Sequence, residues 1–226
     1  MRRSTQIAIF LILGLAAATA NAATLQVNNT AALGGTGGTA CSGGPCGLEV
    51  AFQGDTDRAF LQDDSPNAEE IYRFAFRIDT TNLTMVQGTT RHVVGWVRDA
   101  SNRAFMRLEL LQANNKSRIM FKCRNNGNNW QVMNSNGKWF IFDNDDTRFM
   151  FEMQAGSAPG AGDGLCRGTK FAADGVTPNF VSERTGLNNS TNSVDHIRVG
   201  AVKDVDATTT GSHYFDEFES YRTLAP

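Results

Sequence analysis

The sequence predicts an all-β protein built as an antiparallel sandwich. From Leu48 onward, short segments alternate apolar and polar residues with the period of two that a half-buried strand requires. Turns rich in glycine and asparagine or aspartate separate them, as in "SNGK" around Gly137 and "ADG" at 173–175. No segment carries an apolar helical stripe of useful length. Many short strands with frequent turns are typical of a sandwich.

Four segments show the alternation most clearly. Their apolar faces are Phe74, Phe76 and Ile78 in "YRFAFRID"; Ala104, Met106, Leu108 and Leu110 in "AFMRLELLQ"; Ile119, Phe121 and Cys123 in "SRIMFKCR"; and Phe149, Phe151 and Met153 in "RFMFEMQ". The opposite faces are mostly polar and carry Arg73, Ala75, Arg77 and Asp79; Arg107 and Glu109; Arg118, Lys122 and Arg124; and Arg148, Glu152 and Gln154. Because side chains in a strand alternate faces, each segment is expected to have one buried and one solvated side.

The first residues predict a secretory signal peptide. Arg2 and Arg3 precede an apolar run at 7–18, and "ANAA" at 20–23 offers small residues in the A-x-A spacing of a cleavage site. The run is shorter than the ~20 apolar residues of a membrane-spanning helix. We therefore expect cleavage after Ala22, no membrane insertion of the mature chain, and export to the periplasm or the extracellular space.

Charge and length limit the remaining classes. Removal of Arg2 and Arg3 leaves 19 basic and 23 acidic side chains, which argues against nucleic acid as a partner. Roughly two hundred mature residues are enough for one domain with a substantial core. We expect a flexible lead-in rich in glycine, threonine and alanine at 23–45, or a loosely paired first strand there, followed by one domain at 46–226.

Four cysteines in an exported chain suggest two disulfides. The turn-forming residues in "CSGGPC" favour a local bridge between Cys41 and Cys46, which leaves Cys123 to pair with Cys166. A bridge of the second kind closes a long loop and stabilises by about 4 kcal/mol in the loop-entropy estimate. The spacing is not that of a zinc ribbon or a C-x-x-C redox pair.

Several segments resemble a known group of domains. "DDSPNAEEIYRFAFRIDTTNLTM" (63–85), "MRLELL" (106–111), "GAGDGL" (160–165) and "VDHIRVGAV…GSHYFDEFES" (194–220) are similar to LamG-like jelly-roll domains of bacterial secreted proteins, in the concanavalin A-like lectin/glucanase superfamily. The resemblance covers about residues 46–222 and implies a single jelly-roll β-sandwich. That superfamily includes lectins, adhesion modules, glycosidases and polysaccharide lyases, so the fold does not by itself assign a function.

The closing segment "HYFDEFES" carries three carboxylates. Strict alternation places Asp216 on one face with Tyr214 and Phe218, toward the interior, and Glu217 and Glu219 on the other face with Phe215. Asp216 is therefore predicted to be a buried structural acid, and an aspartate at this place in similar jelly rolls ties a neighbouring loop. Glu217 and Glu219 share a face, as a glycosidase pair would. However, the E-x-D-x-x-E strand of laminarinase-type enzymes is absent, so we assign no catalytic residue here.

Lyase chemistry has one partial signal. "RLEL", with Arg107 and Glu109, resembles the R-x-E-L strand of jelly-roll alginate lyases. The Q-[IV]-H and Y-x-K-x-G-x-Y strands of those enzymes are absent, and His92, His196 and His213 fall in unrelated segments. A charged pair on a solvated sheet face explains Arg107 and Glu109 more simply.

Binding residues are therefore the main prediction. Trp130 follows the exposed-looking tip "NNGNN" and is the preferred aromatic platform, with Trp96 and Trp139 as further tryptophans. The polar faces offer a charged surface suited to an anionic or strongly hydroxylated ligand: Arg73, Arg107, Glu109, Lys122 and Glu152. We expect a non-catalytic, lectin-like module that binds an extracellular glycan or surface molecule. The alternatives are a polysaccharide-active glycosidase or lyase, and an adhesion protein that binds another protein.

No cofactor is predicted, and the sequence offers one weak candidate site for calcium. Calcium takes oxygen ligands, and the acidic loop "DNDD" offers Asp143, Asp145 and Asp146. The spacing is not that of an EF-hand, so an acidic turn without an ion is the preferred interpretation.

Overall fold

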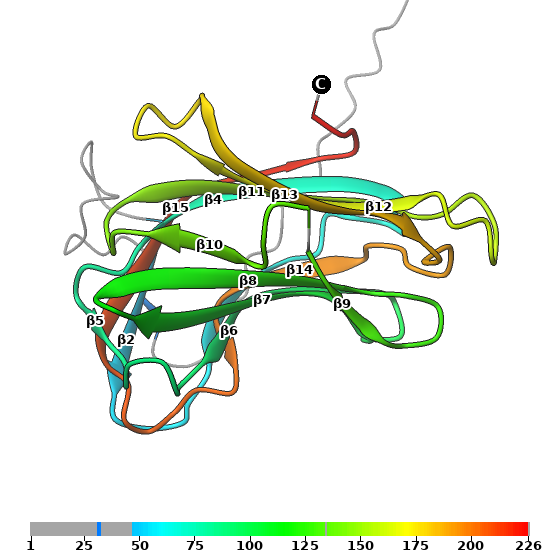
Figure 1. Ribbon diagram of the computed structural model, residues 1–226. Helices are drawn as coiled ribbons and strands as arrows, with labels where there is room; N and C mark the ends of the chain where they lie inside the picture. Colours follow the sequence, from blue (N-terminus) through cyan, green and yellow to red (C-terminus); the bar gives the residue numbers. More distant parts are fainter. Residues whose placement is uncertain (1–30, 33–46, 134, 226) are drawn as a thin grey trace, which may run out of the picture.

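In a computed structural model, residues 31–32, 47–133 and 135–225 are described, and they form two antiparallel sheets packed face to face (Figure 1). The all-β jelly-roll prediction is confirmed. The elements of the described ranges are all strands, and none of those ranges contains a helix long and apolar enough to cross a membrane.

The eight-stranded sheet has the order β1-β2-β15-β4-β11-β12-β13, with β5 paired to β15. Its strands are β1 (Ala31–Ala32), β2 (Leu48–Gln53), β4 (Ile71–Asp79), β5 (Leu83–Thr84), β11 (Thr147–Gln154), β12 (Gly164–Phe171), β13 (Pro178–Leu187) and β15 (Thr210–Tyr221). Strand β1 lies inside the segment expected as a lead-in and pairs with β2.

The seven-stranded sheet has the order β10-β8-β7-β6-β14-β3, with β9 paired to β8. Its strands are β3 (Ala59–Asp63), β6 (His92–Arg98), β7 (Ala104–Ala113), β8 (Lys116–Arg124), β9 (Trp130–Val132), β10 (Trp139–Phe142) and β14 (His196–Lys203). Strands far apart in sequence, such as β3 and β14, are neighbours here because the chain crosses between the sheets.

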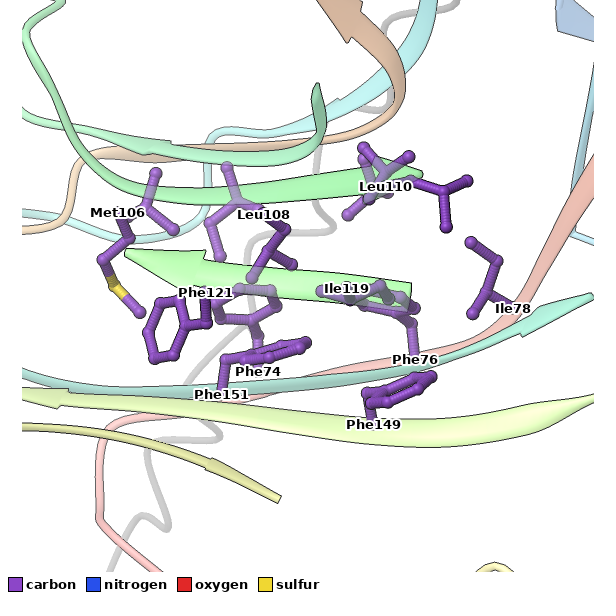
Figure 2. Close-up of a cluster of buried hydrophobic side chains, with 14 of the residues drawn as sticks. Phe74, Phe76, Ile78, Met106, Leu108, Leu110, Ile119, Phe121, Phe149 and Phe151 are labelled. Carbon is purple, nitrogen blue, oxygen red and sulfur yellow. The ribbon is translucent and has the colours of Figure 1, made fainter. Parts of the chain in front are cut away.

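The core forms where the apolar faces of the two sheets meet. Phe74 and Phe151 of the eight-stranded sheet pack against side chains of β7 and β8 (Figure 2). Phe121 and Phe151 meet edge to face across the sheets, with 5.0 Å between ring centroids. Burying a phenylalanine of this kind stabilises by about 1.5–3 kcal/mol. The predicted apolar faces of the four clearest segments lie in this interior, with the exception of Ala104. A register shift in the pairing of β6 with β7 sets Ala104 opposite Arg98, and Phe105 joins the core instead.

One disulfide connects the two layers. Cys123 in β8 and Cys166 in β12 are bonded, as predicted, and both side chains are fully buried. Cys41 and Cys46 lie outside the described residues.

The closing strand differs from the prediction. His213 and Phe215 are buried, and Phe215 packs edge to face on Phe76 with 5.5 Å between centroids. Asp216 is only half-buried, so its assignment as an interior acid is wrong. The pairing with β4 slips between Asp216 and Glu219, and Glu217 has a φ of 48°. This bulge breaks the alternation on which the prediction depended.

Candidate functional site

Polar side chains cross the outer face of the seven-stranded sheet in a continuous row. Strand pairing sets Lys122 beside Arg107, Arg107 beside Trp96, Trp96 beside Arg198, and Arg198 beside Gln62. All five are half-buried and alternate with residues of the core. Neighbouring strands lie about 4.8 Å apart, so this row is about 19 Å long. We call these five residues the basic row.

One end of the basic row is built around a buried carboxylate. Glu109 is 4% exposed and accepts a hydrogen bond from Lys122 Nζ at 2.8 Å. Arg107 Nε lies 2.8 Å from the same carboxylate, and Arg91 lies 3.8 Å from it. Arg107 also donates to Asp204 at 2.7 Å. Glu109 therefore holds Arg107 and Lys122 in fixed positions on the sheet.

An open hollow of about 810 Å³ lies over this end of the row. Its lining contains the cations Arg91, Arg107 and Lys122, together with Glu109 and Asp204. A hollow of this size, lined by charged groups on a rigid sheet, suits a hydroxyl-rich or charged ligand better than an apolar one.

Trp96 supports cations at the centre of the row. The guanidinium carbon of Arg98 lies 4.0 Å from the Trp96 ring centroid, and Lys203 Nζ lies 5.5 Å from it. Cation–π contacts of this kind attract the cation toward the ring face. The sequence favours Trp130 over Trp96 as the aromatic platform, although the alternation in "HVVGWVR" places Trp96 on the same face as Arg98.

The far end of the row carries Arg198. Its guanidinium packs over the Phe60 ring at 4.7 Å, and its Nε donates to Gln62 Oε1 at 2.6 Å. Both contacts come from β3, the neighbouring strand. Arg198 is thus held against the sheet by an aromatic ring and an amide rather than by a carboxylate.

This end has an excess of positive charge. In the described part of the chain, Arg58, Arg98 and Arg198 make no ion pair. Burial, together with the charges of Arg198 and Arg58, lowers the pKa of Arg98. Burial and Arg58 lower the pKa of Arg198, and Asp64 opposes that effect. An anion bound here would reduce the mutual repulsion of the three guanidinium groups.

The other two tryptophans lie on the same outer face. Trp130 in β9 pairs with Arg124, whose guanidinium lies 4.4 Å from the Trp130 ring centroid. Trp139 in β10 pairs with Met120, and Arg91 lies 5.7 Å from its ring. Trp130, the predicted platform, is half-buried beneath Arg124. All three tryptophans of the chain therefore contribute to this face.

The predicted charged face is divided between the two sheets. Arg107, Glu109 and Lys122 lie together, whereas Arg73 and Glu152 lie on β4 and β11 of the other sheet. Arg73 stacks over Tyr221 at 4.1 Å. Alternation specifies which side of a strand is polar but not which sheet the strand joins. The prediction that all five residues share one face was therefore wrong.

Glu152 is a structural acid. It is fully buried and accepts two hydrogen bonds from Arg167, at 2.6 and 3.1 Å, and one from the backbone N–H of Ala225 at 2.6 Å. These contacts tie the C-terminal residues to the outer face of the eight-stranded sheet. They leave no open position for a ligand at this carboxylate.

The acidic loop does not gather into a metal site. Asp143 pairs with Lys116, Asp146 pairs with Arg77, and Asp145 accepts a hydrogen bond from Thr147. Over the described ranges, no group of three or more His, Cys, Asp or Glu side chains is placed to hold a metal ion.

The two glutamates of the closing strand are also paired with arginines. Glu217 lies 2.7 Å from Arg77, and Glu219 lies 2.8 Å from Arg148. Both pairs lie on the outer surface of the eight-stranded sheet, away from the basic row. His92 and His213 are core residues, whereas His196 is half-buried at the end of β14.

No family model matches the chain, and no curated protein matches it. Among solved structures, the receptor-binding domain of botulinum neurotoxin type G is similar at a TM-score of 0.57 and 9% identity, covering 90% of this chain and 44% of that chain. A second structure is described by the statement that cell entry of botulinum neurotoxin type C is dependent upon interaction with two ganglioside molecules. It is similar at a TM-score of 0.51 and 11% identity, covering 90% of this chain and 42% of that chain. An alginate lyase from Alteromonas sp. 272 has a TM-score of 0.42 and 8% identity, covering 75% and 82%.

The similarities to the two neurotoxin structures show a shared β-sandwich fold. The chain spans less than half the length of the neurotoxin domains that it matches.

Proposed function

We propose that the protein is a secreted, lectin-like module that binds an extracellular glycan on the outer face of its seven-stranded sheet. The observation that carries this proposal is the basic row, in which Arg107, Arg198 and Lys122 are held at fixed spacing across the sheet. A row about 19 Å long suits a polymer better than a single small molecule. Within the concanavalin A-like superfamily, the LamG-like domains are the group to which we assign the chain.

The chemistry of the row favours an acidic glycan. Guanidinium groups bind carboxylates through paired, charge-assisted hydrogen bonds. Among the described residues Arg198 makes no ion pair, and Asp64 is the carboxylate whose charge acts on it. The hollow beside Arg107 adds polar groups for hydroxyls, whereas the amide of Gln62 is already engaged by Arg198 and Asp64. Botulinum neurotoxin type C, whose structure is similar, is described as depending on interaction with two ganglioside molecules for cell entry. That description gives a glycolipid partner for a protein that shares this fold over 42% of its length.

We propose that Glu109 supports binding by positioning its neighbours and is not a catalytic residue. Its carboxylate is contacted by Lys122 and Arg107, with Arg91 nearby, and its side chain is nearly inaccessible. A general base must reach a proton of the substrate, and a carboxylate engaged in this way is poorly suited to that task. Its role is to position the neighbouring cations.

A glycan array probed with the mature protein tests the proposal. We expect retention on acidic polysaccharides, weaker retention of Arg107→Gln and Trp130→Ala, and unchanged retention of Arg73→Gln, which lies on the other sheet. Thermal unfolding of each variant checks that the fold is intact. Loss of binding in Arg73→Gln alone, or no retention on any glycan together with capture of a protein partner, would contradict it.

A polysaccharide-active enzyme is the second candidate, because Arg107 and Glu109 of "RLEL" line the open hollow. Incubation with β-glucans, alginate and other uronates distinguishes the two functions. Reducing ends or unsaturated products that vanish in Glu109→Gln would replace the binding proposal with catalysis.

A further inference from the structure

A second cavity, separate from the basic row, lies between the sheets where β2 and β15 face β3 and β14, and it opens to the surface beside Asp216 and Glu217. Its volume is about 310 Å³. The wall is mainly apolar and includes Leu61, Phe76, Val199, Phe215 and Phe218. An engineered apolar cavity of about 150 Å³ is enough to bind benzene. This cavity is therefore large enough for a small organic molecule.

Two carboxylates without ion-pair partners line this apolar space. Asp63 is 4% exposed, and its Oδ1 accepts the backbone N–H of Ser65 at 2.8 Å. Asp216 Oδ1 accepts the backbone N–H of Glu217 at 2.8 Å. Within the described ranges neither carboxylate forms an ion pair. A nearly buried carboxylate is costly to keep charged unless a positive group or hydrogen bonds compensate it.

The nearby arginines are engaged with other acids. Arg77 pairs with Glu217 at 2.7 Å and with Asp146 at 2.9 Å. Arg222 pairs with Glu69 at 3.2 Å. The charge of Glu217 is thereby balanced, whereas Asp63 and Asp216 line the cavity and make no ion pair among the described residues.

The bulge in β15 brings these groups to the cavity wall. Phe215, Asp216, Glu217 and Phe218 all line the cavity, although they are consecutive residues. In a regular strand only alternate side chains face one side. Bulges and positive φ values at non-glycine residues cluster at functional sites, where they redirect side chains. The positive φ of Glu217 belongs to the bulge that brings these four consecutive residues to the cavity wall.

We propose that this cavity binds a small organic cation, an ammonium group on an apolar body. The apolar body would fill the space among the phenylalanines, and the ammonium would lie against Asp63 and Asp216. The rings of Phe76, Phe215 and Phe218 add cation–π attraction for such a ligand. A bare metal ion fits less well, because no metal-binding group of side chains forms in the described residues.

Calorimetric titration of the mature protein with three matched probes tests the charge requirement. The probes are phenethylammonium, the neutral 2-phenylethanol and the anionic 3-phenylpropanoate. We expect saturable binding of the ammonium, binding of the alcohol weaker by about tenfold or more, and no binding of the anion. Equal affinities for all three, or no saturable binding of the ammonium, would overturn the proposal.

Variants locate the site. Asp63→Asn and Asp216→Asn should each weaken ammonium binding by about tenfold and leave alcohol binding unchanged. The control Asp57→Asn, at an exposed loop position, should leave both unchanged. Asp216 is half-buried, so Asp216→Asn keeps the test valid if Asp63→Asn does not fold. Ammonium binding unaffected by either substitution in folded protein would place the ligand elsewhere and refute the site. Glycan binding by the basic row is measured separately and is not expected to change.

Discussion

His92 and His213 meet in the core with their ring centroids 5.4 Å apart, one from each sheet. Both are almost fully buried, and none of their ring nitrogens has a hydrogen-bond partner among the described residues. Phe52 contacts both rings, and Phe215 contacts His213. This apolar setting favours two neutral imidazoles.

Acid should therefore destabilise the fold. Burial lowers the pKa of His92 to about 4, and burial together with His92 lowers the pKa of His213 well below its ordinary value. The unfolded state takes up protons below about pH 6.5 while the folded state does not, so stability is complete above that pH and falls as pH drops toward 4. Each histidine contributes about 1.4 kcal/mol per pH unit in that window.

Urea unfolding between about pH 7 and pH 5 measures the effect. The double variant His92→Phe/His213→Phe should have a much flatter dependence of unfolding free energy on pH. Because acidic groups also titrate at the low end, the comparison with the parent protein is the informative quantity. Identical slopes for the two proteins would show that these imidazoles are not responsible.

The disulfide should carry a substantial part of the stability. Cys123 and Cys166 are 43 residues apart in sequence, and cross-linking them restricts the unfolded chain. Replacing both with alanine should lower the free energy of unfolding by about 4 kcal/mol in the loop-entropy estimate. The matched control is the parent protein unfolded with and without a reductant. A loss below about 1 kcal/mol would contradict the expected contribution.

The buried ion pair of Glu152 and Arg167 should be strongly coupled. Arg167→Leu leaves a fully buried carboxylate without its arginine and should cost about 3–5 kcal/mol. The double variant Glu152→Leu/Arg167→Leu should recover much of that loss, because no unpaired charge remains. A double-mutant cycle from denaturant unfolding measures the coupling. Additive losses would mean that the pair does not act as a unit.

Much of the fold was predictable because alternation is a local property. Phe74, Phe121 and Phe151 are buried as the period of two indicates. The register shift between Asp216 and Glu219 was not predictable, since a bulge depends on how β15 pairs with β4 rather than on its own pattern. The local alternation therefore could not assign Phe215 to the correct face.

The candidate site was only partly predictable for a related reason. Arg107 and Lys122 come from strands adjacent in sequence, and their proximity follows from a hairpin. Arg198 joins them only because β14 lies beside β6, a pairing of residues about one hundred positions apart in the chain. Sequence alternation also could not separate Arg73, which lies on the opposite sheet, from this group.

Binding of an acidic polysaccharide before and after chemical reduction of its carboxyl groups tests the central claim most directly. If the basic row recognises acidic groups, the mature protein should bind the parent polymer, lose affinity as salt rises, and bind the reduced polymer weakly. Arg198→Gln should lower affinity for the parent polymer by about tenfold, and Arg73→Gln should not change it. Equal affinity for both polymers, or equal binding by Arg198→Gln and the parent protein, would contradict it.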